Sequence, residues 1–232
     1  MKYWIYLFLW FPFLVQGQLL PANRFFNSNQ TNTFIWDNTS SNGVVNNGSG
    51  TWNATNLTWL KLPNGVNQLW TNGSSATFGG NPGQGSAGTV TVSGTQNVKS
   101  LIFDPTSSGN FILQNGSLNL QGGLWEVNQN ATISSTLQGI ANYTKKGNAN
   151  LTLTGNNSYS GTLTISQGGI YASATNAMGT SPVILGDANT GTSNIEWRWA
   201  GSTQPSTSLT VSNLGTGTVT IGAYSVGLNT QH

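Results

Sequence analysis

Five acidic side chains could supply carboxylate chemistry to this protein: Asp37, Asp104, Glu126, Asp187 and Glu196. Hydrolysis of a glycosidic bond needs two carboxyl groups about 5–10 Å apart. Asp104 and Glu126 are 22 residues apart in the sequence and would be neighbours in a chain that coils with that period. However, Asp104 precedes Pro105 at an expected turn, whereas Glu126 falls within an expected strand. We therefore interpret this pair as structural and not as a catalytic dyad.

Other catalytic and metal-binding groups are scarce. The sequence contains no cysteine, and its one histidine is the last residue, His232. These facts exclude a thiolate nucleophile and argue against a Ser-His-Asp triad or a zinc site. The few, dispersed acidic residues also argue against a calcium site. The sequence predicts a protein that is not an enzyme and holds neither a cofactor nor a metal.

The segment Glu196–Trp199, with the sequence EWRW, is the best candidate for ligand binding. In a strand, alternation places Trp197 and Trp199 on one face and Glu196 and Arg198 on the other. The tryptophan pair could grip a glycan, because an indole offers an apolar face with a polar edge. The favoured alternative is structural, with packed indoles and a solvated ion pair.

The composition excludes some classes of partner. Charged residues make up 5% of the 232 residues, compared with roughly 25% in an ordinary soluble domain. The net charge of +2 comes from dispersed cations, and Lys145-Lys146 is the one adjacent basic pair. Nucleic-acid binding needs clustered basic residues, so we do not expect it here. Hydrophobic residues at 36% are sufficient for a folded chain.

The N-terminus differs from the rest of the chain. After Lys2, residues 3–15 form an apolar run of about thirteen residues, whereas a membrane span needs about 20. Val15 and Gly17 suit a cleavage site, so we predict a signal peptide over residues 1–17 in preference to an uncleaved anchor. No later run is apolar enough to span a membrane. We expect an exported mature chain that begins with a polar lead-in at residues 18–33.

Residues 34–88 carry tryptophans among Asn, Gly and Ser, namely Trp36, Trp52, Trp59 and Trp70. Exposed indoles in such a setting can stack on sugar rings. Buried indoles can instead close the end of a stack of repeats, because the terminal repeat has one face without a neighbour. We favour the second interpretation and predict an aromatic-rich N-terminal cap.

Short alternating strands dominate residues 89–232, where no apolar period of 3.6 residues indicates a helix. Similar segments place Leu118, Leu163 and Leu209 at separations of 45 and 46 residues. With about three strands per coil, we interpret this spacing as two coils of about 22–23 residues each. The pattern predicts a parallel β-solenoid. The main alternative, a β-sandwich made of hairpins, does not explain the recurrence.

Residues 143–173, YTKKGNANLTLTGNNSYSGTLTISQGGIYAS, resemble the autotransporter-associated β-strand repeat. The matching positions are Lys145, Gly147, Leu151, Leu153, Gly155, Asn157, Tyr159, Gly161, Thr164, Ile165 and Gly168. The resemblance implies an all-β, right-handed, single-stranded parallel β-helix, exported and displayed at the cell surface or outer membrane, or secreted. In this family the repeat is associated with export of the passenger. A C-terminal translocator is also implied but is not contained in the sequence, so we expect a fragment or another form of anchoring.

These observations predict a non-enzymatic exported scaffold, similar to a segment of an autotransporter passenger and monomeric. Its partners would be surface glycans or ligands of a host or matrix. One alternative is an adhesin or carbohydrate-binding module that uses Trp197 and Trp199. A polysaccharide-degrading enzyme is a weaker alternative, because acidic residues are few.

Overall fold

The computed structural model describes residues 33–39, 45–61, 65–80, 85–200, 207–212 and 214–224. The predicted signal peptide, residues 18–32 of the lead-in and His232 lie outside this part of the chain. The regular elements of the described residues are all β-strands, as the alternation predicts. Within the same residues there is no helix, and so none that could cross a membrane.

The strands form two sheets, which we call sheet A and sheet B. Sheet A consists of β1 (Thr33–Trp36), β3 (Trp59–Lys61), β4 (Val66–Gln68), β5 (Ser74–Phe78), β7 (Thr95–Phe103), β9 (Ser117–Leu120), β10 (Gly123–Val127), β12 (Thr136–Gln138), β13 (Tyr143–Lys146), β15 (Leu163–Ile165), β17 (Val183–Leu185) and β19 (Leu209–Val211). Sheet B consists of β2 (Gly48–Trp52), β6 (Ala87–Val92), β8 (Phe111–Gln114), β11 (Ala131–Ile133), β14 (Asn150–Leu153), β16 (Gly168–Ala172), β18 (Ile195–Ala200) and β20 (Val219–Tyr224).

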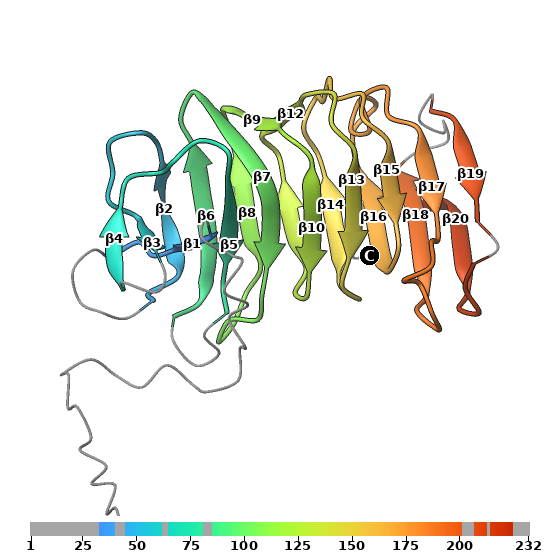
Figure 1. Cartoon of the computed structure of the whole chain (residues 1–232), viewed down its shortest axis with the longest axis horizontal. Helices are drawn as coiled ribbons and strands as arrows, with labels where there is room; N and C mark the ends of the chain where they lie inside the picture. The colour runs from blue at the N-terminus through green and yellow to red at the C-terminus, as the bar shows by residue number, and fades with distance from the viewer. Residues whose placement is uncertain are drawn as a thin grey trace, which may run out of the picture.

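The chain coils by passing repeatedly from sheet A to sheet B. From β13 onward, consecutive strands alternate between the sheets, and each strand pairs in parallel with the equivalent strand of the next coil. Figure 1 shows the result as strands lying side by side along the long axis of the molecule. They follow chain order throughout sheet B and, along the main path of sheet A, from β5 onward, whereas β3 and β4 lie beyond β1 at the N-terminal end. The protein is therefore a parallel β-solenoid, and the predicted fold class is confirmed.

The register corrects one part of the predicted repeat. Leu163 pairs with Val183, which pairs with Leu209, so Leu163 and Leu209 are two coils apart as predicted. Leu118, in contrast, lies on β9 and pairs with Leu137 of β12, outside the column of Leu163. The reason is that β7 is long enough to pair with both β9 and β10, which gives these coils an additional short strand. Sequence spacing does not reveal such a change in the cross-section.

The interior is a stack of inward side chains. In β14, Leu151 and Leu153 have no exposed surface, while Thr152 between them is half-buried. Burying a leucine side chain contributes roughly 1.5–3 kcal/mol, so these columns are the main source of stability. One column of sheet A consists of Leu101, Trp125, Lys145, Ile165 and Leu185 in register.

Aromatic side chains fill the N-terminal end of the solenoid. There β1 pairs with β3 and β3 with β4 in antiparallel fashion, unlike the parallel coils that follow. The indoles of Trp36, Trp52 and Trp59 have no exposed surface, and that of Trp70 is 7% exposed. The ring centroids of Trp52 lie 4.8 Å from those of Trp59 and 4.7 Å from those of Trp70. These rings offer no accessible face to a sugar. Their mutual packing agrees with the predicted cap at this end of the solenoid.

Candidate functional site

The residues of the repeat motif form the interior and the corners of the coil. Leu151, Leu153 and Ile165 are buried in the core, and Tyr159 packs edge-on against Trp125 with 5.9 Å between ring centroids. Thr164 points outward from β15 and is partly exposed. The glycines lie where a Cβ would come within 2.5 Å of another heavy atom: Gly147, Gly155, Gly161 and Gly168. The motif thus specifies packing and close approach of backbone.

Lys145 is a buried cation that closes a corner of the coil. Its Nζ donates to the backbone carbonyl oxygens of Gly147, Ala149 and Gln167 at 2.5, 2.6 and 2.8 Å. Burial lowers the pKa of Lys145 to about 7, because the ammonium form is removed from water. Gly168 completes the corner with φ at +64°, where a Cβ would lie 2.5 Å from the Lys145 Nζ.

Asn157 connects three successive coils. Its Oδ1 accepts a hydrogen bond from the Leu137 backbone N–H at 2.7 Å, and its Nδ2 donates to the Ala177 carbonyl oxygen at 2.6 Å. Asn157 is 5% exposed, so both backbone groups would be buried without these partners. The asparagine of the motif therefore maintains the alignment of the stack.

The positions of Trp197 and Trp199 agree better with the favoured alternative of packed indoles than with a possible glycan contact. Alternation in β18 does place both indoles on one side, 5.3 Å apart, but this is the inward side. Trp197 has no exposed surface and Trp199 is partly buried against the core. Because stacking needs an accessible ring face, a sugar cannot reach Trp197. Glu196 and Arg198 face outward and form the predicted ion pair, with Nε and Oε2 3.2 Å apart.

Asp104 and Glu126 lie close together but are not equally accessible. The Asn128 Nδ2 lies 2.8 Å from Asp104 Oδ1 and 3.2 Å from Glu126 Oε1, so these two oxygens are no more than about 6 Å apart. This separation suits a catalytic dyad. However, Asp104 is 2% exposed, and a polysaccharide could not contact it. The Asn128 amide therefore bridges two structural carboxylates.

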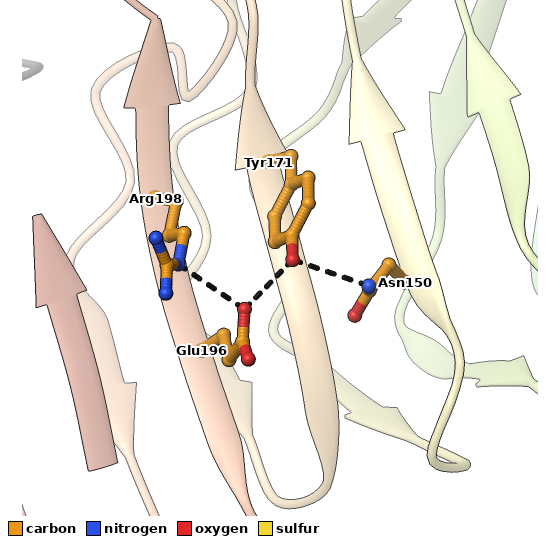
Figure 2. Close-up of polar contacts among 4 residues, drawn as sticks. All are labelled: Asn150, Tyr171, Glu196 and Arg198. Carbon is orange, nitrogen blue, oxygen red and sulfur yellow. Dashed lines mark hydrogen bonds and ion pairs between the residues drawn. The ribbon is translucent and has the colours of Figure 1, made fainter. Parts of the chain in front are cut away.

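The outward side of sheet B carries a connected set of polar side chains, which we call the outer polar row: Asn150, Tyr171, Glu196 and Arg198 (Figure 2). The Asn150 Nδ2 donates to Tyr171 Oη at 3.2 Å, and the Tyr171 hydroxyl donates to Glu196 Oε2 at 2.7 Å. The same Oε2 is paired with Arg198. Three adjacent strands, β14, β16 and β18, thus supply one hydrogen-bonded network.

Register explains how this network forms. Asn150 of β14 and Glu196 of β18 both pair with Gly169 of β16, which has no side chain to separate them. The Tyr171 ring lies over this gap, since its Cε1 is 3.1 Å from where a Gly169 Cβ would be. The phenol hydroxyl therefore reaches between the amide and the carboxylate.

A polar hollow of about 430 Å³ opens beside the outer polar row, at the N-terminal ends of the same strands. Its shape follows from unequal turns: β15 and β16 are joined by two residues, whereas β17 and β18 are joined by nine. The longer connection supplies Thr192, Ser193 and Asn194 to the lining. The lining residues are Asn148, Asn150, Gly168, Thr192, Ser193, Asn194 and Glu196.

This arrangement is suited to binding by hydrogen bonds. Amide, hydroxyl and carboxylate groups line the hollow, and the charge of Glu196 is compensated by Arg198. No three His, Asp or Glu side chains of the described residues gather in a way that could hold a metal ion. The row and the hollow together offer donors, acceptors and one aromatic ring.

Sequence reasoning identified Glu196 and Arg198 but missed Asn150 and Tyr171. Tyr171 is 25 residues before Glu196, and Asn150 is a further 21 residues away. Because the coils differ in length, no fixed period brings the three residues together. The available signal was Gly169, a glycine within a strand, which often marks a close approach by another group.

The fold and the coil-forming motif define a parallel β-solenoid protein of the kind that the repeat predicts. Over 184 residues, the chain is 29% identical to the "Adhesin BmaC autotransporter" of Brucella suis biovar 1 (strain 1330). The match covers 76% of this chain and 5% of that protein, so the chain spans a small part of its length. The resemblance to autotransporter repeat proteins is thereby confirmed. No family model and no solved structure matches the chain.

Proposed function

We propose that this chain is a non-enzymatic, adhesive segment of an exported protein that is displayed at the cell surface. The observation that carries the proposal is the similarity to an autotransporter adhesin along 76% of the chain. A regular solenoid is suited to this role, because its uniform core presents an extended surface without requiring charged or catalytic groups. The motif residues are mostly buried and serve packing and turns, which supports the role of a scaffold.

The absence of enzymatic activity is part of the proposal. Asp104 is the partner that a glycosidase mechanism would need beside Glu126, and it is almost completely buried. Both carboxylates also accept from the Asn128 amide, which gives them a structural role. A reducing-sugar assay on plant and bacterial polysaccharides should therefore detect no release of product by the purified protein.

Surface display followed by an adhesion assay tests the proposal. The full chain would be joined to an established translocator in a non-adherent bacterial strain. Accessibility to external protease reports display, and retention on epithelial monolayers and on matrix-coated plates reports adhesion. We expect both to exceed those of cells with the translocator alone. Display without any gain in retention would contradict the adhesive role.

A further inference from the structure

The hollow beside the outer polar row has the features of a ligand site. It is lined by Asn148, Asn150, Ser193 and Glu196, and its volume of about 430 Å³ falls within the range of small-molecule sites. It lies on a face where β16 is hydrogen-bonded to β14 and β18 on its two sides. No strand edge is available there, so an extended peptide cannot bind by adding a strand.

The polar groups indicate the chemistry of the ligand. Glu196 uses Oε2 for its contacts with Tyr171 and Arg198, which leaves Oε1 to accept a further hydrogen bond. The Asn150 amide and the Ser193 hydroxyl can both donate and accept. Adjacent hydroxyl groups of a sugar match such a set, because each can donate to a carboxylate and accept from an amide.

Electrostatics favours an uncharged ligand. The one carboxylate of the lining, Glu196, is paired with the one guanidinium of the outer polar row, Arg198. An anion would therefore face the Glu196 carboxylate, and a cation would compete with Arg198 for it. A neutral, hydroxyl-rich molecule avoids both penalties.

The Tyr171 ring adds the second element of sugar recognition. Its Cε1 lies over Gly169. Its hydroxyl is hydrogen-bonded to Asn150 and Glu196, which both line the hollow (Figure 2). A ring held in one orientation can stack on the C–H face of a pyranose at little cost in side-chain entropy.

We propose that the hollow and the outer polar row bind an uncharged saccharide, with Glu196 and Asn150 contacting its hydroxyls and Tyr171 its ring. This inference rests on the proposed adhesive function, because it names the ligand class of the same surface. A terminal sugar of a host glycoprotein and a neutral polysaccharide share this chemistry.

Titration of the purified full chain with three neutral disaccharides tests the site. Lactose, maltose and N,N′-diacetylchitobiose would be examined by saturation-transfer NMR and calorimetry, with 3′-sialyllactose as the charged counterpart of lactose. We expect at least one neutral disaccharide to bind at millimolar concentration or below, and sialyllactose not to bind more tightly than lactose. Absence of binding by all three up to about 10 mM, or binding of sialyllactose alone, would overturn the proposal.

Variants test whether the saccharide binds at these residues. Glu196→Gln and Tyr171→Ala should each weaken binding about tenfold, the effect of losing one strong contact. Glu126→Gln is the matched control, because Glu126 is an outward carboxylate of sheet A that also accepts from an amide. If Tyr171→Ala does not fold, Glu196→Gln carries the test alone. Equal binding by the site variants and the control would overturn the proposal.

The same variants distinguish this inference from the proposed function. Displayed cells that carry Glu196→Gln or Tyr171→Ala would be compared with wild type in the adhesion assay. Adhesion that persists in these variants, together with no disaccharide binding by the wild type, would remove the saccharide site and leave the adhesive role intact. If the variants lose both adhesion and disaccharide binding, the result supports the adhesive function and the saccharide site together.

Discussion

The ammonium group of Lys145 lies 2.8 Å from the backbone carbonyl oxygen of Gln167, which belongs to the next coil. The same group donates to the carbonyl oxygens of Gly147 and Ala149 in its own corner, so one side chain joins two coils. Lys145→Met keeps most of the buried stem and removes the three hydrogen bonds. We expect it to lower the free energy of unfolding by about 2–4 kcal/mol, because buried carbonyl oxygens lose their donor.

Lys146→Met is the matched control for this prediction. Lys146 follows Lys145 on β13 but points outward and is partly exposed. Its replacement should change the free energy of unfolding by no more than about 0.5 kcal/mol. Urea unfolding followed by circular dichroism measures both variants. Similar losses at the two positions would contradict the role assigned to the carbonyl contacts.

Asn157→Ala should destabilise the stack between coils. It removes the acceptor of the Leu137 N–H and the donor to the Ala177 carbonyl oxygen, and both groups are buried. We expect a loss of about 2–3 kcal/mol in the free energy of unfolding. Thermal melts followed by circular dichroism compare this variant with Asn156→Ala, at the exposed neighbouring position, which should have little effect on the melting temperature. If both variants melt together, the bridging role of Asn157 is wrong.

Much of the fold could be predicted from the sequence because stacking repeats the same local physics. Leu151, Leu153 and Ile165 alternate with threonine, and such a period can be read without knowing the partner strand. The direction of a face is harder to predict. Trp197 and Trp199 alternate with Glu196 and Arg198, and this alternation fits both packed indoles and an exposed glycan contact. The sequence does not say which face turns inward, and the burial of Trp197 agrees with the packed indoles that we favoured.

The candidate site was less predictable because it depends on register. Asn150, Tyr171 and Glu196 meet because Gly169 separates them in the sheet and the connection after β17 is long. The local pattern of a single strand reveals neither the pairing of Asn150 and Glu196 with Gly169 nor the position of the long connection beside them. The displacement of Leu118 from the predicted column has the same cause, since β9 is an additional strand that spacing alone does not show.

Trp197→Ala should affect stability and not ligand recognition. The side chain has no exposed surface, and its truncation leaves a large cavity between coils. A loss of about 3–5 kcal/mol is the usual cost of such a change. Trp199→Ala should cost less, because Trp199 is partly exposed. Guanidinium unfolding curves give the order of the two variants, and a larger effect at Trp199 would contradict the burial seen here.

Asp187 should make the free energy of unfolding of the solenoid depend on pH in the acidic range. Partial burial raises the pKa of Asp187, but hydrogen bonds from Ser166 Oγ and from Asn189, together with the Lys146 charge, outweigh this and lower it below its usual value of 3.8. The folded chain therefore binds fewer protons than the unfolded chain near this pH. The resulting stabilisation is fully present above about pH 4 and is lost as the pH falls through the lowered pKa.

Asp187→Asn isolates this effect. The asparagine does not titrate, so the variant should lose less of its stability than wild type between about pH 4 and pH 2. Ser166→Ala should act in the same direction, because it removes the hydroxyl that donates to Asp187 Oδ2 at 2.7 Å. Thr164→Ala, at an outward position of the same coil, serves as the control. Thermal melts at a series of pH values measure all four proteins, and parallel curves for wild type and Asp187→Asn would show that Asp187 does not contribute.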